Sequence, residues 1–280
     1  MDKLVQLYGR REAEAIRCLV AEKCFALSRT DVLLGRMDSM SPAMQRRWQG
    51  ILHRLHEGEP VQYVLGEADF LGRAFRVTPD VLIPRPETEE LVRRILSRSV
   101  MPFRALDLCT GSGCIAVSLA LAGCEVTATD ISTQALAVAR DNAKRLGAAV
   151  TFLWDDLLAT ALLGSDTPLS CSDFSLIVSN PPYVTESERA DMSPHVLHHE
   201  PSLALFVHGD PLLFYRHIAR VARALLRPGG LLAVEANRNY VTDVAELFKN
   251  NGFIEVNTYE DQFRNPRFVF AEAPCPVCSE

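Results

Sequence analysis

Apolar residues in the first part of the chain recur at the three- and four-residue spacing of an amphipathic helix. They follow Ser41 and Pro42, an N-cap and a first-turn proline, and they are Met44, Trp48, Ile51, Leu52 and Leu55. Gly58 and Pro60 end this helix. The pattern predicts a small helical domain over residues 1–66.

A short hairpin is predicted next. The runs Ala68 to Leu71 and Ala74 to Val77 flank Gly72-Arg73, which is typical of a tight turn between two strands. The chain continues as Ile83-Pro84-Arg85-Pro86-Glu87-Thr88-Glu89, where prolines stiffen the backbone before a helix begins. Residues 67–86 therefore read as a linker.

From Arg104 onward, short apolar runs alternate with helical patterns, which indicates an α/β fold with a doubly wound parallel sheet. One helix is expected from Ser132 to Leu146, with a serine N-cap and Gly147 at its end. This catalytic domain spans residues 87–274, and residues 275–280 form a tail. The expected strands are Ala105–Leu108, Glu125–Thr129, Val150–Leu153, Leu176–Ser179, Leu231–Glu235, Ile254–Tyr259 and Arg267–Ala271.

Composition narrows the class of protein. The chain has 280 residues, 48% of them hydrophobic, which is enough apolar material for two globular domains. A net charge of -6 argues against direct binding to nucleic acid through phosphate contacts. No leader segment and no membrane-span pattern are visible, so we expect a soluble cytoplasmic protein. Of the eight cysteines, Cys275 and Cys278 form a lone CxxC, which lacks the second pair that a zinc site needs.

A glycine-containing loop follows the first strand of the α/β domain. It reads Asp107-Leu108-Cys109-Thr110-Gly111-Ser112-Gly113, so backbone here can approach a nucleotide-like ligand at the carboxyl end of the sheet. The dinucleotide pattern G-x-G-x-x-G fails, which disfavours NAD and FAD. Asp130 ends the second strand, where a carboxylate can accept hydrogen bonds from both ribose hydroxyls. Trp154-Asp155-Asp156 ends the third strand, where a carboxylate can accept from an adenine amino group. Each feature alone is also compatible with a turn or a helix cap.

The sharpest motif is Asn180-Pro181-Pro182-Tyr183, directly after an apolar strand. Two prolines fix the backbone and remove two N–H donors, so the carbonyls stay free to accept from a substrate NH₂ group. The Asn180 side-chain oxygen can take one N–H, the Pro181 carbonyl can take the other, and the Tyr183 ring can cover a planar acceptor group. The motif therefore predicts a clamp for an amino group.

The glycine loop, the acidic strand end and Asn-Pro-Pro-Tyr together resemble class I methyltransferases that act on planar amino groups. More specifically, the chain resembles the release factor glutamine methyltransferase family, called PrmC or HemK, over nearly its whole length. The segments that carry this resemblance are Tyr63 to Gly66, Phe70-Leu71-Gly72, Ile83 to Glu89, Asn180 to Tyr183 and Glu200-Pro201.

The resemblance implies a seven-stranded class I methyltransferase sheet behind a helical domain and a hairpin. It also implies S-adenosylmethionine as cofactor, S-adenosylhomocysteine as product, no metal, and bacterial class 1 release factors as substrates. By position, Asn180, Pro181, Pro182 and Tyr183 hold the glutamine, with Asn180, Pro181 and Tyr183 catalytic. The cofactor is assigned to Cys109, Thr110, Gly111, Ser112, Gly113, Asp130, Asp156, Leu157 and Asn180. The chain departs from the family pattern at Cys109, where glycine is usual, at Ala236 to Asn239, and at Gln262 to Pro266.

Two other functions remain open at this stage. A DNA or RNA adenine-N6 methyltransferase would hold a flipped adenine in the same clamp. A binding protein with an inert fold would use neither the loop nor the clamp.

The roles of three further segments are also open. Glu87 and Glu89 either line the pocket or complement the dipole of the following helix. The pair His198-His199 has no metal-ligand spacing. The long stretch Val184 to Val207 suggests a lid.

Overall fold

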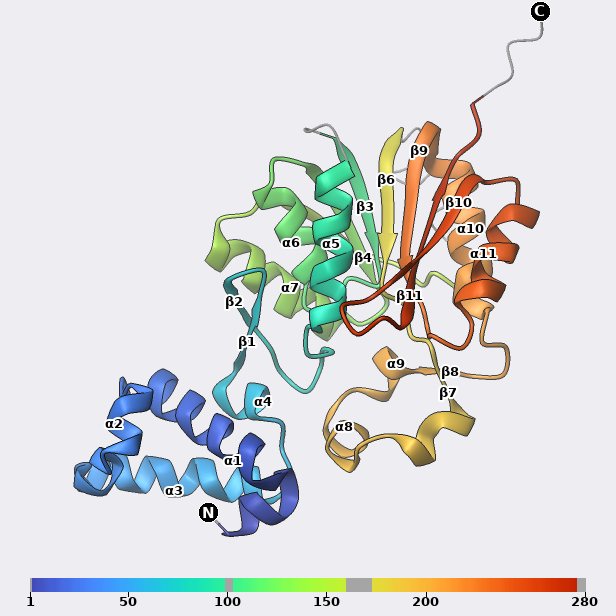
Figure 1. Cartoon of the computed structure of the whole chain (residues 1–280). Helices are drawn as coiled ribbons and strands as arrows, with labels where there is room; N and C mark the ends of the chain where they lie inside the picture. Colours follow the sequence, from blue (N-terminus) through green and yellow to red (C-terminus); the bar gives the residue numbers. More distant parts are fainter. Residues whose placement is uncertain (1, 99–102, 160–172, 276–280) are drawn as a thin grey trace, which may run out of the picture.

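The protein consists of a helical N-terminal part and an α/β part, joined by a hairpin (Figure 1). The computed structural model describes residues 2–98, 103–159 and 173–275. None of the helices in this described part is long and apolar enough to cross a membrane.

The α/β part is built on a seven-stranded sheet with the order β10-β11-β9-β6-β3-β4-β5. The β3, β4, β5, β6 and β9 strands pair in parallel, and β11 lies antiparallel to both β9 and β10. The predicted set of strands is therefore confirmed. Their bounds are β3 Arg104–Leu108, β4 Glu125–Asp130, β5 Val150–Trp154, β6 Phe174–Ser179, β9 Leu226–Glu235, β10 Ile254–Glu260 and β11 Pro266–Glu272.

The largest difference from the sequence expectation is at the start of β9. This strand begins at Leu226, whereas the apolar run begins at Leu231. Leu226 pairs with Phe174 and Leu231 pairs with Leu176, so the register shifts between them. Residues 227–230 of β9 lie opposite the single residue 175 of β6 at this irregularity. These four residues include a proline and two glycines and no apolar run, so the pattern did not reveal the first part of the strand.

The strand order places the functional loops. From β3 the chain moves to β4 and β5 on one side, and then crosses to β6 on the other side of β3. Ligands of such sheets bind beyond the carboxyl ends of the strands at the point where this direction reverses. The glycine loop follows β3 and Asn-Pro-Pro-Tyr follows β6, so the order brings them to the same edge of the sheet.

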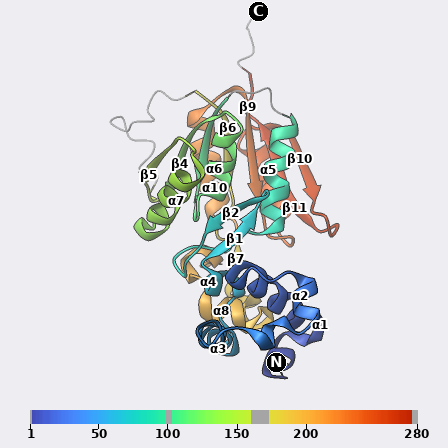
Figure 2. The same cartoon turned by 90° about the vertical axis from the view of Figure 1, so that its left-hand side faces the viewer.

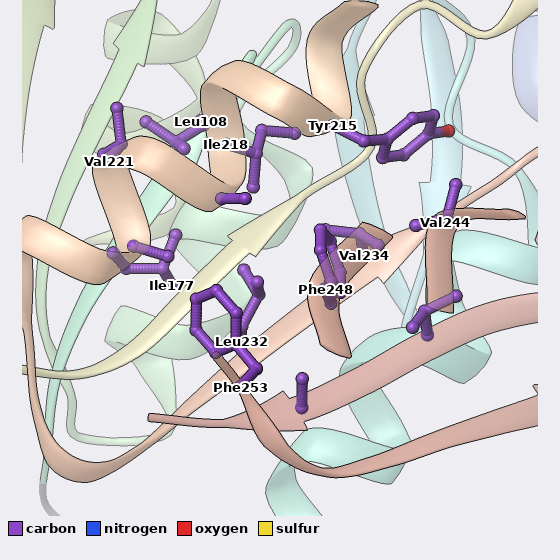
Figure 3. Close-up of a cluster of buried hydrophobic side chains, with 14 of the residues drawn as sticks. Leu108, Ile177, Tyr215, Ile218, Val221, Leu232, Val234, Val244, Phe248 and Phe253 are labelled. Carbon is purple, nitrogen blue, oxygen red and sulfur yellow. The ribbon is translucent and has the colours of Figure 1, made fainter. Parts of the chain in front are cut away.

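Helices cover both faces of the sheet, and apolar residues of the strands alternate between them. On one face α5 (Pro86–Arg98), α6 (Cys114–Leu121) and α7 (Thr133–Leu146) pack, with Ala105 and Val178 beneath them. On the other face lie α10 (Leu213–Leu225) and α11 (Val241–Asn250). Figure 3 shows Ile177 and Leu232 among the side chains of this second core. Both faces are thus buried, as a parallel sheet requires.

The N-terminal part packs its own core. It contains α1 (Asp2–Phe25), α2 (Arg29–Leu33), the 3₁₀ turn η1 (Arg36–Ser39), α3 (Pro42–His56) and α4 (Val61–Leu65), and α1 is interrupted at Gly9. The predicted helix start is confirmed, since the Ser41 hydroxyl accepts a hydrogen bond from the N–H of Met44. Leu55 and Val20 are among the buried residues of this core. The same helical region lies at one end of the molecule, below the main sheet (Figure 2).

The hairpin is present, but its predicted turn is wrong by one residue. Its strands β1 (Glu67–Phe70) and β2 (Arg73–Arg76) pair Phe70 with Arg73, so Leu71 and Gly72 form the turn. Both turn residues have positive φ, 49° and 73°, as a two-residue type I′ turn demands. Leu71 occupies a position that favours glycine or asparagine, which is why the sequence pointed to Gly72-Arg73.

The stretch from Val184 to Val207 folds into defined elements rather than an open loop. It contains β7 (Val184–Thr185), the 3₁₀ turn η3 (Glu186–Asp191), α8 (Pro194–His199), α9 (Ser202–Leu205) and β8 (Phe206–Val207), and β7 pairs with β8. The His195 ring stacks on Tyr8 at 4.6 Å between centroids, and its Nδ1 lies 2.9 Å from the Gly58 carbonyl oxygen. This segment therefore connects the clamp to the N-terminal helices.

Candidate active site

A cavity of about 260 Å³ opens at the carboxyl edge of the sheet. Of the residues assigned to the cofactor by sequence, Cys109, Gly111, Asp130, Asp156 and Leu157 line this cavity. Pro182 of the clamp lines it as well. The structure thus brings the loop after β3, the ends of β4 and β5, and the motif after β6 to one cavity.

Three other loop residues do not line the cavity and instead hold the loop in shape. The Thr110 hydroxyl donates to Asp107 at 2.6 Å, and the Ser112 carbonyl accepts from Asn142 at 2.9 Å. A Cβ added to Gly113 would lie 3.0 Å from the Ala139 Cβ, so glycine lets the start of α6 approach α7. Asn180 also stands outside the lining of the cavity, next to Pro181.

Cys109 has the backbone conformation of a glycine. Its φ is 61°, in the left-handed region that L residues rarely adopt. The preference for glycine at this position in the family that the sequence resembles is therefore a backbone requirement. Cysteine tolerates the position because its side chain is small and unbranched, and it packs partly against the core on the α10 side.

We expect Cys109→Val to lower the free energy of unfolding by about 1–3 kcal/mol, because a β-branched residue is strained at this φ. Cys109→Gly should stay within about 1 kcal/mol of the wild type, since the relieved strain offsets the entropy cost of glycine. Urea titrations of the three proteins measure both values. A valine variant as stable as the wild type would show that the loop relaxes freely.

Asp130 connects the second strand to the loop. Its carboxylate accepts from the N–H of Gly111 at 2.8 Å and from the N–H of Ser132 at 2.9 Å. Burial raises the pKa of Asp130, and hydrogen bonds from the backbone of Ser132, Gly111 and Ile131 counteract that shift. A carboxylate has about four acceptor positions, so Asp130 keeps acceptor capacity for a hydroxyl group of a ligand in the cavity.

The far wall of the cavity is apolar. Ile131, Leu157, Leu158, Leu203 and Phe214 contribute to it, while Asp156 uses Oδ1 to accept from the N–H of Leu158 at 3.0 Å. A carboxylate that can accept from ribose hydroxyl groups, beside a wall suited to a flat aromatic base, provides the contacts that an adenosine requires. The residues present therefore fit S-adenosylmethionine.

Asp107 is a buried acid beneath the loop. Its side chain is inaccessible to solvent, and burial raises its pKa to about 7. Its partners within the described residues include the Thr110 hydroxyl on Oδ2, while Oδ1 has no hydrogen-bond partner there.

This pKa gives the folded protein a pH dependence. The folded state keeps the Asp107 proton that the unfolded chain loses near pH 4, so its stabilising contribution is complete below about pH 4. The contribution is lost as the pH rises through about 7. Free energy of unfolding should fall by up to about 1.4 kcal/mol per pH unit between pH 5 and 7 from this group. Asp107→Asn should flatten that slope, whereas Asp243→Asn on the exposed face of α11 should leave it unchanged.

An outer wall of the cavity comes from two segments far apart in sequence. Val81 and Leu82 of the linker and Leu203 and Ala204 of α9 all line it. Glu200 joins the two segments, because its carboxylate accepts from the N–H of Ile83 and pairs with the Arg85 guanidinium. The Glu200 side chain is 1% exposed and that of Arg85 is 31% exposed.

The clamp residues are joined by hydrogen bonds to groups that the sequence did not single out. The Asn180 Nδ2 donates to Thr88 Oγ1 at 3.1 Å, and the Thr88 hydroxyl donates to Glu235 Oε2 at 2.7 Å. The Tyr183 hydroxyl donates to Glu235 Oε1 at 3.1 Å. Burial raises the pKa of Glu235 and that of Tyr183. One buried carboxylate therefore bonds directly to Tyr183 and, through the Thr88 hydroxyl, is connected to Asn180.

The two glutamates beside Thr88 differ in their surroundings. Glu89 accepts from the N–H of Leu71 at 3.0 Å and pairs with Arg93, so it secures the hairpin turn instead of lining the cavity. Glu87 is also absent from the lining, and its charge raises the pKa of Glu235.

In the described part of the chain no group of three or more histidine, cysteine or acidic residues could hold a metal ion. Cys278 of the CxxC lies outside the described residues.

Comparisons with known proteins identify the relatives of this chain. The family described as PrmC N-terminal domain matches residues 4–66, and the family described as Methyltransferase small domain matches residues 88–213. A release factor glutamine methyltransferase of Bacteroides thetaiotaomicron is 43% identical over 273 residues, which covers 96% of this chain and 96% of that protein.

Solved structures share the fold of the α/β part. A methyltransferase from Pyrococcus furiosus gives a TM-score of 0.53 at 18% identity, over 73% of this chain and 90% of that one. The 16S rRNA methyltransferase RsmC of T. thermophilus, in complex with AdoMet and guanosine, gives 0.52 at 20% identity, over 74% of this chain and 49% of that one. The sheet has the fold of a class I methyltransferase.

Proposed function

Because this chain belongs to the family of release factor glutamine methyltransferases, we propose that it methylates peptide chain release factors on glutamine. The methyl group of S-adenosylmethionine goes to the side-chain amide nitrogen, N5, of the glutamine in the Gly-Gly-Gln motif. The observation that supports this most strongly is the position of Asn-Pro-Pro-Tyr at the end of β6, with Pro182 on the wall of a cavity that fits the cofactor.

The proposal gives each site residue a role. Asp130 holds the ribose hydroxyls, and the Asp156-Leu157 region contacts the adenine. The backbone of the loop from Cys109 to Gly113 contacts the amino-acid end of S-adenosylmethionine, and hydrogen bonds of Thr110 and Ser112 hold the loop in shape. Asn180 Oδ1 and the Pro181 carbonyl accept the two N–H groups of the glutamine amide, and Pro182 and Tyr183 bound the planar group.

The chemistry is then mainly a matter of position. An amide nitrogen is a weak nucleophile because its lone pair is delocalised into the carbonyl. Bound S-adenosylmethionine supplies an already electrophilic methyl group. Asn180 and the Pro181 carbonyl orient the nitrogen lone pair toward that methyl group, and their oxygens lie where positive charge develops on nitrogen. The nitrogen becomes acidic on methylation, so its proton leaves afterwards without a dedicated base.

We assign domains and partners accordingly. Residues 1–66 recognise the release factor, residues 67–86 link, and residues 87–274 carry out the transfer, followed by the tail 275–280. The substrates are bacterial class 1 release factors in the cytoplasm, without direct nucleic-acid binding and without a metal. The contact between His195 and Tyr8 supports this division, since it connects the segment after the clamp to the recognition helices.

The test is a transfer assay with radiolabelled S-adenosylmethionine. The purified protein is offered either a bacterial release factor or unmethylated DNA, with a release factor whose Gly-Gly-Gln glutamine is alanine as the matched substrate control. Label on the release factor that is lost with the alanine substrate supports the proposal. Label on DNA alone would replace it with adenine-N6 methylation.

A further inference from the structure

The side-chain amide of Asn180 has two ends of opposite character, and the clamp works with only one of them. Its oxygen accepts hydrogen bonds and its NH₂ group donates them. A substrate NH₂ group needs the oxygen. An amide turned by 180° would present two donors to the substrate and repel it, so the orientation of Asn180 decides whether the clamp can bind.

Thr88 faces the NH₂ end. Asn180 Nδ2 lies 3.1 Å from Thr88 Oγ1, and Oδ1 has no donor among the residues that the structure describes. A threonine hydroxyl carries one hydrogen and could either donate to an amide oxygen or accept from an amide NH₂. The direction of the Thr88 hydroxyl hydrogen therefore decides which end of the Asn180 amide faces Thr88.

Glu235 fixes that hydrogen. Thr88 Oγ1 lies 2.7 Å from Glu235 Oε2, and an ionised carboxylate can only accept. The Thr88 hydrogen must therefore point to Glu235, which leaves the Thr88 oxygen able only to accept from Asn180. The other Glu235 oxygen accepts from Tyr183 at 3.1 Å, so both oxygens are engaged.

The surroundings of Glu235 make these bonds consequential. Glu235 is 1% exposed and Thr88 is 2% exposed, so water does not compete with either bond. Burial raises the pKa of Glu235, whereas the hydrogen bonds from Thr88 and Tyr183 and the charge of Arg267 favour its ionised form. The bonds join α5, β9 and the loop after β6, and Thr88 stands 147 residues from Glu235 in sequence.

We propose that Thr88 and Glu235 are positioning residues for methyl transfer, which set the Asn180 amide with its oxygen toward the substrate. Both residues are buried and neither lines the cavity, so they act through Asn180. The inference rests on the proposed function, because it concerns the group that the clamp accepts.

The experiment compares Thr88→Val, which keeps the shape and removes the hydroxyl, with Thr88→Ser, which keeps the hydroxyl. Thr88→Val should lower kcat for the release factor by about 10- to 100-fold with little change in the affinity for S-adenosylmethionine. Thr88→Ser should recover most of that loss. Glu235→Gln, whose NH₂ can donate to Thr88 and so reverse the bond order, should resemble Thr88→Val. Thr151→Val on exposed β5 is the control for the substitution itself.

A double variant separates positioning from a general structural effect. In an Asn180→Ala background, Thr88→Val should cost no further kcat, because the group it orients is gone. A full additional loss in that background, or an unchanged kcat in the single variant, would overturn the inference. A wild type that transfers no methyl group would instead contradict the proposed function.

Hydrogen exchange of the Asn180 side chain tests the inference even if the wild type transfers no methyl group. In ¹⁵N-labelled wild type, the Asn180 side-chain NH₂ signal, identified by its loss in Asn180→Ala, should exchange slowly with solvent. Thr88→Val should speed this exchange about tenfold or more, while Thr88→Ser should preserve the protection. Equal exchange in all three proteins would show that Thr88 does not hold the amide.

Discussion

Asn180→Ala is expected to lower kcat for release-factor methylation by about 10²–10³-fold. The variant removes one of two acceptors that face the developing charge, and losses of this size follow removal of one such group in other enzymes. Asn180 does not line the cofactor cavity, so the KM for S-adenosylmethionine should change far less than kcat.

The matched control for this substitution is Asn257→Ala, on the exposed side of β10. It should retain full activity. If Asn180→Ala weakened cofactor binding as much as it lowered kcat, the side chain would belong to the cofactor site, and the clamp would need another acceptor.

Glu200→Gln is expected to lower the free energy of unfolding by about 3 kcal/mol. Removing one partner of a buried ion pair leaves the other charge uncompensated, at a cost of about 3–5 kcal/mol. The lower end applies because the Arg85 side chain is 31% exposed and can regain water. Affinity for S-adenosylmethionine should fall as well, since the pair holds two segments of the cavity wall together.

Urea unfolding with an unchanged m-value measures the loss, and Glu186→Gln is the control. Glu186 pairs with Arg189 at 3.4 Å with both side chains about half exposed, at 49% and 51%, so its loss should cost under about 1 kcal/mol. Equal losses in the two variants would mean that Glu200 contributes no more than a surface ion pair.

Much of the fold could be predicted because its determinants are local. The apolar runs identified all seven strands of the main sheet, and the signals at Ser132 and Gly147 located α7. The failures lie where backbone geometry overrides residue preference. Leu71 takes a positive φ in the hairpin turn, and residues 227–230 interrupt the pattern of β9 without ending the strand.

The candidate site was only half visible in the sequence. Residues that line the cavity occur in short motifs, so the loop and Asp130 could be singled out from the sequence, and the family resemblance predicted their role toward the cofactor. Thr88 and Glu235 could not, since their bond spans 147 residues and each has a local explanation, as a first-turn residue of α5 and as the last residue of β9. A polar residue at the end of an apolar strand was the one available signal for Glu235.

The departures from the family pattern near the C-terminus have structural explanations. Asn237 and Asn239 both donate to the Glu188 carboxylate, at 2.8–2.9 Å, which joins the end of β9 to η3. Asp261 accepts from the N–H of Phe263 and of Asn265, which closes the turn between β10 and β11. Neither turn lies in the cofactor cavity.

The central claim is that the methyl group goes to a glutamine amide, and peptide mass spectrometry tests it most directly. A release factor is incubated with the enzyme and S-adenosylmethionine, digested, and the Gly-Gly-Gln peptide is fragmented. We predict a single added methyl group on the glutamine side-chain nitrogen, absent when Asn180→Ala replaces the wild type. A methyl group on another residue of the release factor, or an unmodified peptide alongside methylated adenine in added DNA, would contradict the account.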